Sequence, residues 1–214
     1  TGVNSYTGAT GTGSAGGVVF ANDTAPTTSG FTGSGTVTIE SATNSFGGLV
    51  TGNYTYDTTI TGLTLGKSGN LTNVTLNSLV DISGPITVYA PQITVNQSLS
   101  TSGGLTLNGQ SVLNGSSITT TGSQSYNGAV TLGVNTVLTS TSAGDISFAN
   151  TLNGAKTLMV NTSGATVFNG AVGGTTALTS LTTDAGGSVA INGGVVNTTG
   201  AQSYGEAATL GAAT

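Results

Sequence analysis

The feature that most constrains the fold is an internal repeat with a period of about 20 residues. Residues 120–133 recur as residues 198–211 with 10 of 14 positions identical, so position i of the first copy returns at i+78. Between the two copies, and before the first copy, single apolar residues recur at nearly equal steps. These landmarks are Val80, Leu99, Ile118, Leu138, Leu158, Leu178 and Val196. A unit this small cannot bury its own apolar face, so neighbouring units must stack.

Each landmark is followed by a glycine turn and a second short apolar strand. These second strands contain Ile86, Leu105, Tyr126, Ile146, Val167, Val189 and Tyr204. Apolar residues alternate with polar ones at period two, and β-branched, Gly and Asn residues leave no helical pattern. The sequence therefore predicts an all-β fold, a parallel β-helix (β-solenoid) with coils of about 20 residues. Position i then lies under position i+20, at the strand spacing of ~4.8 Å.

Stacking also explains the unusual composition. Gly (36), Thr (43), Ser (24) and Asn (18) together make 121 of the 214 residues, and only 4% are charged. In a solenoid each side chain lies between its equivalents in the coils above and below, so a repeated charge meets like charges. Thr, Ser and Asn side chains both donate and accept hydrogen bonds, which lets identical neighbours bond to each other.

The regularity divides the chain into two parts. Residues 60–214 are predicted to be β-helix repeats, and residues 1–59 an irregular Gly/Thr-rich β segment continuous with the solenoid. A strand is expected at residues 35–40, and no linker separates independent domains.

Several classes of function lack the residues they need. The chain has no His and no Cys, so Ser-His-Asp and Cys-His systems cannot form, and zinc, haem and iron–sulfur sites lose their usual ligands. With Lys67 and Lys156 as the only cations and a net charge of −5, binding to nucleic-acid phosphates is not expected. Apolar runs are too short to insert into a membrane. We therefore assign no enzymatic activity, no catalytic, cofactor-binding or metal-ligating residue, and no cofactor.

The carboxylates fit this interpretation. They are Asp23, Glu40, Asp57, Asp81, Asp145, Asp184 and Glu206. The three that lie near turns are Asp81, Asp145 and Asp184, and they are separated by about three coils and about two coils. They cannot form one compact pair in this phase, and we interpret them as solvated turn residues. A β-helix lyase would also need a basic residue beside clustered carboxylates.

Other candidate surfaces depend on facing. Tyr126, Phe148, Phe168 and Tyr204 share one coil phase and are predicted to stack in the interior, whereas Tyr54, Tyr56 and Tyr89 are the candidates for exposed contact. An ice-binding face would need a regular Thr-x-Thr array in register, which the sequence does not show. Asn-x-Ser/Thr sequons permit glycosylation without arguing for it; they include Asn22, Asn53, Asn70, Asn73, Asn96, Asn114, Asn161 and Asn197.

The repeats resemble those of a known class of exoprotein. Residues 61–70 (TGLTLGKSGN), 83–89 (SGPITVY), 93–96 (ITVN) and 121–128 (TGSQSYNG) look like units of the large secreted proteins of the filamentous-haemagglutinin type. The resemblance covers roughly residues 30 to 214. It is specific for this type of repeat, but it does not indicate a ligand. The Asn-Pro-Asn signatures of that family's secretion domain are absent, because no Asn-Pro pair occurs. The segment therefore resembles the shaft of such a protein.

The resemblance implies a fold, a location and partners. Such proteins are right-handed β-helices that Gram-negative bacteria export through a partner outer-membrane pore and display as secreted, cell-surface adhesins. Our first hypothesis is thus an extracellular structural and adhesive shaft, with host-cell or matrix glycans and neighbouring repeats of the same long chain as partners. The alternative is a self-assembling subunit of an extracellular filament or matrix fibre that stacks end to end. Unpaired strand edges at both ends of a solenoid would template such stacking.

Overall fold

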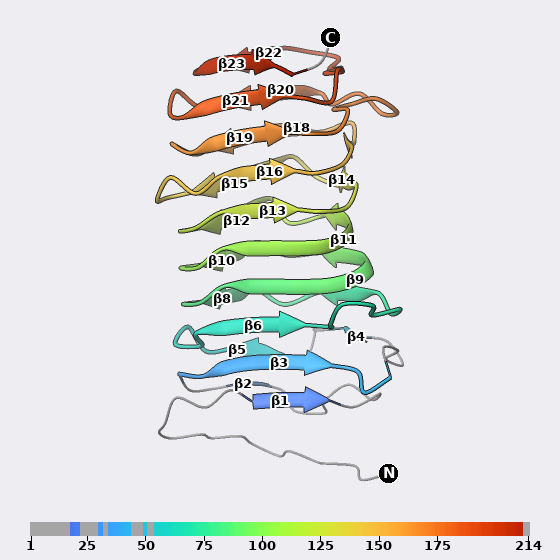
Figure 1. Cartoon of the computed structure of the whole chain (residues 1–214), viewed down its shortest axis with the longest axis vertical. Helices are drawn as coiled ribbons and strands as arrows, with labels where there is room; N and C mark the ends of the chain where they lie inside the picture. The colour runs from blue at the N-terminus through green and yellow to red at the C-terminus, as the bar shows by residue number, and fades with distance from the viewer. Residues whose placement is uncertain (1–17, 22–29, 32–33, 44–48, 51–53, 212–214) are drawn as a thin grey trace.

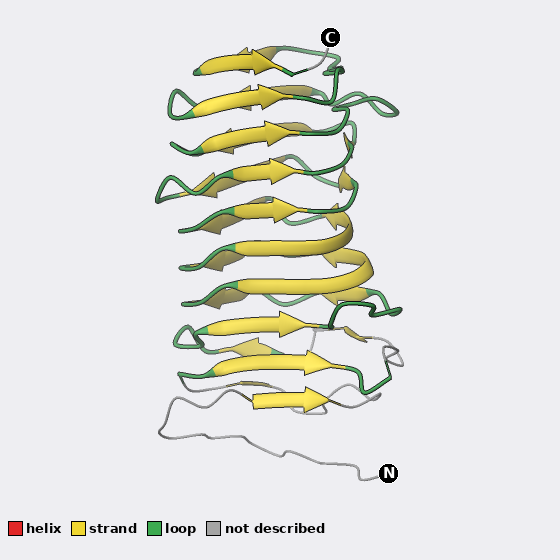
Figure 2. Cartoon of the chain, in the orientation of Figure 1, coloured by secondary structure: helices red, strands yellow, loops and turns green. Residues whose placement is uncertain are grey.

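The chain is a parallel β-solenoid with no helix in the part that is described (Figures 1 and 2). The computed structural model describes residues 18–21, 30–31, 34–43, 49–50 and 54–211 of the 214. All strand pairs in these ranges are parallel, and successive coils of about 20 residues stack along one axis. None of the described residues belongs to a helix that is long and apolar enough to cross a lipid bilayer. The predicted fold class is therefore confirmed.

Each regular coil crosses three faces. The first face consists of β1 (Val18–Ala21), β3 (Thr36–Glu40), β6 (Gly62–Leu65), the first parts of β9 (Ile86–Val95) and β11 (Leu105–Leu113), β13 (Gln124–Tyr126), β16 (Ile146–Phe148), β19 (Ala165–Phe168), β21 (Ser188–Ile191) and β23 (Ala207–Leu210). The second face consists of β4 (Leu49–Val50), β7 (Val74–Leu76), the second parts of β9 and β11, β14 (Val130–Leu132) and β17 (Leu152–Asn153). The third face consists of β8 (Val80–Ile82), β10 (Leu99–Thr101), β12 (Ser117–Thr120), β15 (Thr136–Ser140), β18 (Thr157–Asn161), β20 (Ser180–Thr183) and β22 (Gln202–Tyr204).

A separate two-stranded sheet pairs β2 (Gly30–Phe31) with β5 (Thr55–Tyr56). The Phe31 ring lies 5.7 Å from the Tyr56 ring and 5.5 Å from the Tyr54 ring, measured between centroids. Tyr54 and Tyr56 are only 3% and 9% exposed. Our prediction that these two tyrosines form an exposed contact surface is wrong, because the pairing of β2 with β5 turns their rings into the core.

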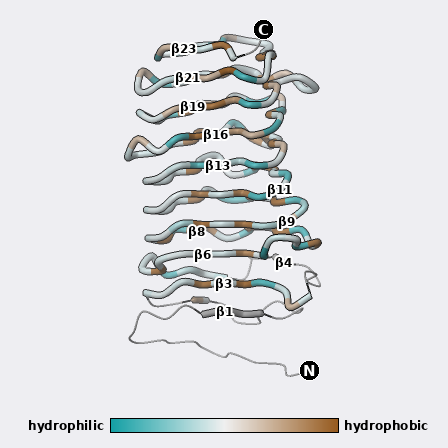
Figure 3. Tube along the Cα trace, in the orientation of Figure 1, coloured by the Kyte–Doolittle hydropathy of each residue, from teal (hydrophilic) through white to brown (hydrophobic). Residues whose placement is uncertain are grey.

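The core follows from period-two alternation within each strand. In β9, Ile86, Val88, Ile93 and Val95 are buried whereas the residues between them are partly or fully exposed, apart from the small Ala90. Hydrophobic residues recur at matching places in coil after coil (Figure 3). Since buried positions lie over buried positions of the next coil, a continuous hydrophobic core runs along the axis.

The predicted phase holds for the first four landmarks and then slips. Val80, Leu99, Ile118 and Leu138 are paired in register, as the spacing predicts. Leu138, however, pairs with Val160 instead of Leu158, and Leu158 pairs with Leu181 instead of Leu178. Leu158 and Leu178 are both buried, so their interior facing is confirmed, but their stacking on Leu138 is wrong.

Two enlarged corners cause the slip. The segment from Leu138 to Ile146 is two residues longer than the segment between their partners, Ile118 and Gln124. Ala143, with a φ of +58°, lies in this corner. A second corner at residues 173–177 adds further length, as the register between β18 and β20 shows. Corners lie outside the sheets, so they lengthen without disturbing the strands.

The interior aromatic stack is confirmed for three of its four predicted members. Tyr126 and Phe148 have ring centroids 4.9 Å apart, and Phe148 and Phe168 have centroids 5.3 Å apart, all nearly parallel. The next residue in this column is Ile191. Tyr204 lies on β22 of the third face, so its assignment to the stack is wrong.

Candidate functional site

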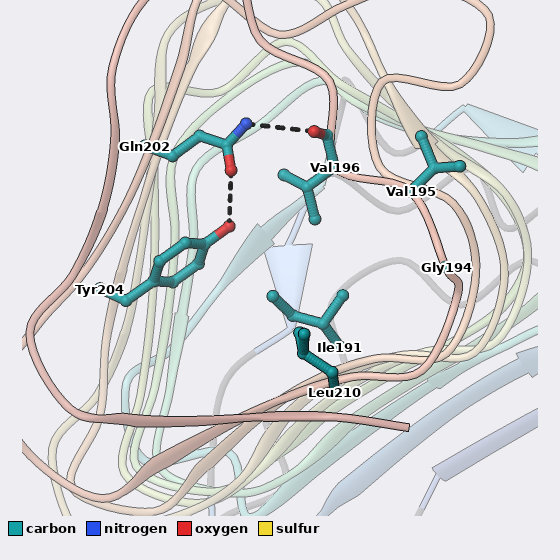
Figure 4. Close-up of a pocket in the computed structure, with 7 residues that line it drawn as sticks. All are labelled: Ile191, Gly194, Val195, Val196, Gln202, Tyr204 and Leu210. Atoms are coloured by element: carbon teal, nitrogen blue, oxygen red, sulfur yellow. Dashed lines mark hydrogen bonds between the residues drawn. The ribbon is translucent and has the colours of Figure 1, made fainter. Parts of the chain in front are cut away.

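The solenoid interior opens into a pocket at the last described coil (Figure 4). The pocket has a volume of about 410 Å³, and its lining residues are Ile191, Gly194, Val195, Val196, Gln202, Tyr204 and Leu210. Four of them are terminal residues of β21, β22 and β23, namely Ile191, Gln202, Tyr204 and Leu210. Leu210 is 62% exposed, although it occupies an inward column of the first face.

Two side chains of this pocket are held in place by hydrogen bonds. The Gln202 Nε2 amide donates to the Val196 carbonyl oxygen at 3.1 Å, and the Tyr204 hydroxyl donates to Gln202 Oε1 at 3.1 Å. Partial burial raises the pKa of Tyr204 through desolvation of its phenolate. The pocket thus combines an apolar floor with one fixed amide and one phenol.

The repeated sequence shows what a covered version of this arrangement looks like. In the first copy, Tyr126 donates to Gln124 Oε1 at 2.8 Å, and Gln124 Nε2 donates to the Ile118 carbonyl oxygen at 3.3 Å. The same amide also donates to the carbonyl oxygen of Thr139, in the following coil, at 2.9 Å. Gln124 and Tyr126 are both 0% exposed. The same local hydrogen bonds thus occur in a covered setting at Gln124 and Tyr126 and in an open pocket at Gln202 and Tyr204.

A second groove lies at the corner between the first and second faces. The segment from Leu65 to Val74 is longer than the segment from Val88 to Ile93, the residues with which these two pair. The residues between Leu65 and Val74 form the loop 66–73, which follows β6 and projects beyond the neighbouring coils (Figure 1). The groove has a volume of about 360 Å³ and is lined by Lys67, Ser68, Gly69, Asn70, Tyr89, Ala90, Pro91 and Asn108.

Asn70 fixes this loop against the next coil. Its side-chain amide donates to the carbonyl oxygens of Tyr89 at 2.7 Å and Thr72 at 2.9 Å, and its Oδ1 accepts from the Thr72 backbone N–H at 3.1 Å. Gly66 has a φ of +74°, and a Cβ there would collide with the Tyr89 carbonyl oxygen. The loop is thus held by a buried amide, which also removes Asn70 from the glycosylation candidates.

Asparagines form ladders at two corners of the solenoid. Asn96 Nδ2 donates to Asn77 Oδ1 at 2.5 Å, and Asn114 Nδ2 donates to Asn96 Oδ1 at 2.7 Å. At the other corner, Asn127 donates to Asn108 at 2.8 Å, and Asn192 donates to Asn169 at 2.8 Å. These bonds join successive coils, in agreement with the expectation that identical polar neighbours bond to each other.

Hydroxyl side chains form one column on the outside of the first face. Thr38, Thr64, Thr87 and Thr106 are paired in succession, and Ser125 and Ser147 continue the column. Thr36 lies two residues before Thr38 but pairs with Gly62, so no second column of threonines runs beside the first at that position. The column lines this face with uncharged hydroxyl groups along several coils.

The carboxylates do not assemble into a recognisable catalytic or metal centre in the described part of the chain. No group of three or more Asp or Glu residues could hold a metal ion there. Asp81 and Asp145 are exposed, and Asp145 Oδ1 accepts from the Ala165 backbone N–H at 2.8 Å. Glu206 Oε2 accepts from the Thr183 hydroxyl at 2.9 Å. Asp23 lies outside the described residues.

One pair of carboxylates differs from the predicted solvated turn residues. Asp184 Oδ1 and Glu206 Oε1 are buried atoms without a hydrogen-bond partner in the structure. Asp184 directly follows Thr183, whose hydroxyl binds Glu206, so both acids lie at the same corner in successive coils. They lie close together because Thr183 pairs with Tyr204, so the residues that follow these two meet at one corner.

Comparison of the chain with protein-family models, with curated proteins and with solved structures gave no significant match.

Proposed function

We propose that this chain is a stretch of extracellular β-helical shaft, which gives length and rigidity to a bacterial surface adhesin. The observation that carries the proposal is the unbroken parallel pairing of the first face, in which ten strands from β1 to β23 follow one another. In such an array every coil contacts only its neighbours, and length is added by repeating the unit. The uncharged outer column of hydroxyl groups suits an exposed rod with uniform sides.

The proposal includes the location and partners that the filamentous-haemagglutinin resemblance implies. The chain would be exported across the outer membrane of a Gram-negative bacterium by a partner pore and displayed at the cell surface. The near lack of charge of the chain fits the stacking of similar coils. The proposal assigns no reaction to the chain. Neighbouring repeats of the same long polypeptide and glycans of a host cell or matrix are the partners that fit a rigid, hydroxyl-lined surface.

Electron microscopy of the native polypeptide, together with its intact mass, tests this function. We expect thin unbranched rods whose length grows with the mass by one strand spacing, ~4.8 Å, for each added coil. Antibodies against the chain should label the surface of intact cells, and a strain without it should adhere less to host cells. Compact particles, or labelling only after lysis, would contradict the proposal.

A self-assembling filament subunit is the second candidate, and the open pocket at β22 and β23 favours it. The Gln202–Tyr204 arrangement repeats one that is covered by a following coil at Gln124–Tyr126. If a second copy supplies that coil, fibres should show an axial repeat near the length of one chain. Leu210→Lys should then shorten the fibres, whereas Met159→Lys, on the side of the solenoid, should not. Isolated rods of native mass would exclude this candidate.

A further inference from the structure

The groove beside loop 66–73 concentrates hydrogen-bond donors in a chain that is otherwise acidic. Lys67 is the one charged residue among the eight that line it, and the protein as a whole carries a net charge of −5. The Lys67 ammonium donates to the Ala42 carbonyl oxygen at 3.3 Å, which fixes it while two of its three protons remain for a ligand. The exposed Ser68 hydroxyl stands next to it.

Asn108 adds a third donor because an asparagine ladder begins there. Its Oδ1 accepts from Asn127, and in each ladder the amide nitrogen is directed at the asparagine of the preceding coil. In the preceding coil, Tyr89 stands opposite Asn108. No described residue accepts a hydrogen bond from the Asn108 amide nitrogen, so this donor remains available in the groove that Asn108 lines.

The remaining wall of the groove is apolar and rigid. Tyr89 is partly exposed and Pro91 is exposed, and both lie in β9 where that strand bends around the corner. Tyrosine presents a large contact area at a small cost in conformational entropy. Since the opposite wall is locked by Asn70, the groove is formed before a ligand arrives.

We propose that this groove binds a sugar residue that carries a carboxylate, within an acidic polysaccharide. The carboxylate accepts charge-assisted hydrogen bonds from Lys67, the sugar hydroxyls bond to Ser68 and Asn108, and the pyranose ring packs on Tyr89 and Pro91. This inference rests on the proposed adhesive function and names its ligand class. With one cation in the groove, each groove binds one acidic residue of the polysaccharide, and the display of many rods together raises the overall avidity above that of a single groove.

The two lysines of the chain provide a matched experiment. Lys67 lies in the groove, whereas Lys156 lies in the corner between β17 and β18, so Lys67→Gln and Lys156→Gln remove the same charge at different places. Each purified protein is titrated with oligogalacturonate and with the same oligomer as its methyl ester, which has no charge. Thermal melting of each variant confirms that it folds.

We expect oligogalacturonate to bind about tenfold or more weakly to Lys67→Gln, and with unchanged affinity to Lys156→Gln. The methyl ester should bind weakly to all three proteins, and Tyr89→Leu should weaken both ligands. Equal losses in the two lysine variants, equal binding of acid and ester, or no binding at all would overturn the inference. So would equally tight, Lys67-dependent binding of dextran sulfate, which carries no carboxylate. None of these results affects the rods seen by microscopy, so the adhesive shaft and its ligand fail separately.

Discussion

The two copies of the repeated sequence occupy different faces of the solenoid. In the first copy, Tyr126 lies on β13 of the first face and β14 follows on the second. In the second copy, Tyr204 lies on β22 of the third face and β23 follows on the first. The column that contains Tyr126 reaches Leu210 four coils later, so the second tyrosine arrives one corner too early to join it.

The difference teaches that the repeated unit is a corner and not a coil. Both copies keep the same local bonds: tyrosine to glutamine, and glutamine to a carbonyl oxygen at i−6. What changes is the surroundings, because Tyr126 is fully buried beside an aromatic neighbour and Tyr204 lines an open pocket. Local sequence thus sets the turn, and the sum of the preceding coil lengths decides which face receives it.

Changing the distance between the copies is the strongest way to break this comparison. Deleting residues 138–159 removes one coil in the observed register, so Val160 takes the place of Leu138 and the fold should persist with a modest loss of stability. Deleting residues 138–148 removes about half a coil and an odd number of residues, which turns inward side chains outward and should abolish folding. Circular dichroism and solubility distinguish the two outcomes. Equal tolerance of both deletions would contradict the register of β15 and β18.

Truncating the tyrosine of each copy measures how much the surroundings contribute. Tyr126→Ala removes a fully buried ring that bonds to Gln124 and stacks on Phe148, and should cost about 3–5 kcal/mol of unfolding free energy. Tyr204→Ala should cost less than about 1 kcal/mol, because its ring lines an open pocket. Chemical denaturation of both variants gives the two values. Similar costs would mean that the last coil is covered in solution.

Alkaline pH sharpens the comparison through the same two side chains. Burial raises the pKa of Tyr126 because desolvation disfavours the phenolate. The pKa of Tyr204, which is less completely buried, is raised for the same reason. The unfolded chain loses its tyrosine protons near pH 10, so stability is full below that pH and falls as pH rises further. Tyr126→Phe should be less stable at neutral pH but lose less stability between about pH 10 and 12. Melting temperatures across that range test this, with Tyr204→Phe as the control of smaller effect.

The smallest expected effect concerns a gap in a ladder between the copies. Ala149 lies between Asn127 and Asn169 in the corner column, which interrupts the asparagine ladder there. Ala149→Asn should add two side-chain hydrogen bonds and about 1 kcal/mol of stability. In an Asn127→Ala background about half of that gain should remain. A loss of stability in both backgrounds would show that Ala149 does not stand in the ladder column.

The regular coils were predictable because their signals are local. Val80, Leu99, Ile118 and Leu138 each precede a glycine turn, and nearly equal corner lengths kept their spacing almost constant. Beyond Leu138 the same signals continue, but two corners lengthen, and the spacing of landmarks no longer reports pairing. Ala143 shows why, since a non-glycine residue with positive φ gives no turn signal in the sequence.

The amino-acid sequence alone sets the kind of fold, its period and its near lack of charge, because stacking of like on like selects short alternating strands and side chains that bond to their own kind. It also determined the corner unit, whose glutamine and tyrosine bond within one short segment of the chain. The face that each unit occupies, and the groove where loop 66–73 meets Asn108, emerge only from the three-dimensional register. These depend on register summed over many coils, and a small change in length at one corner moves every later residue relative to its neighbours.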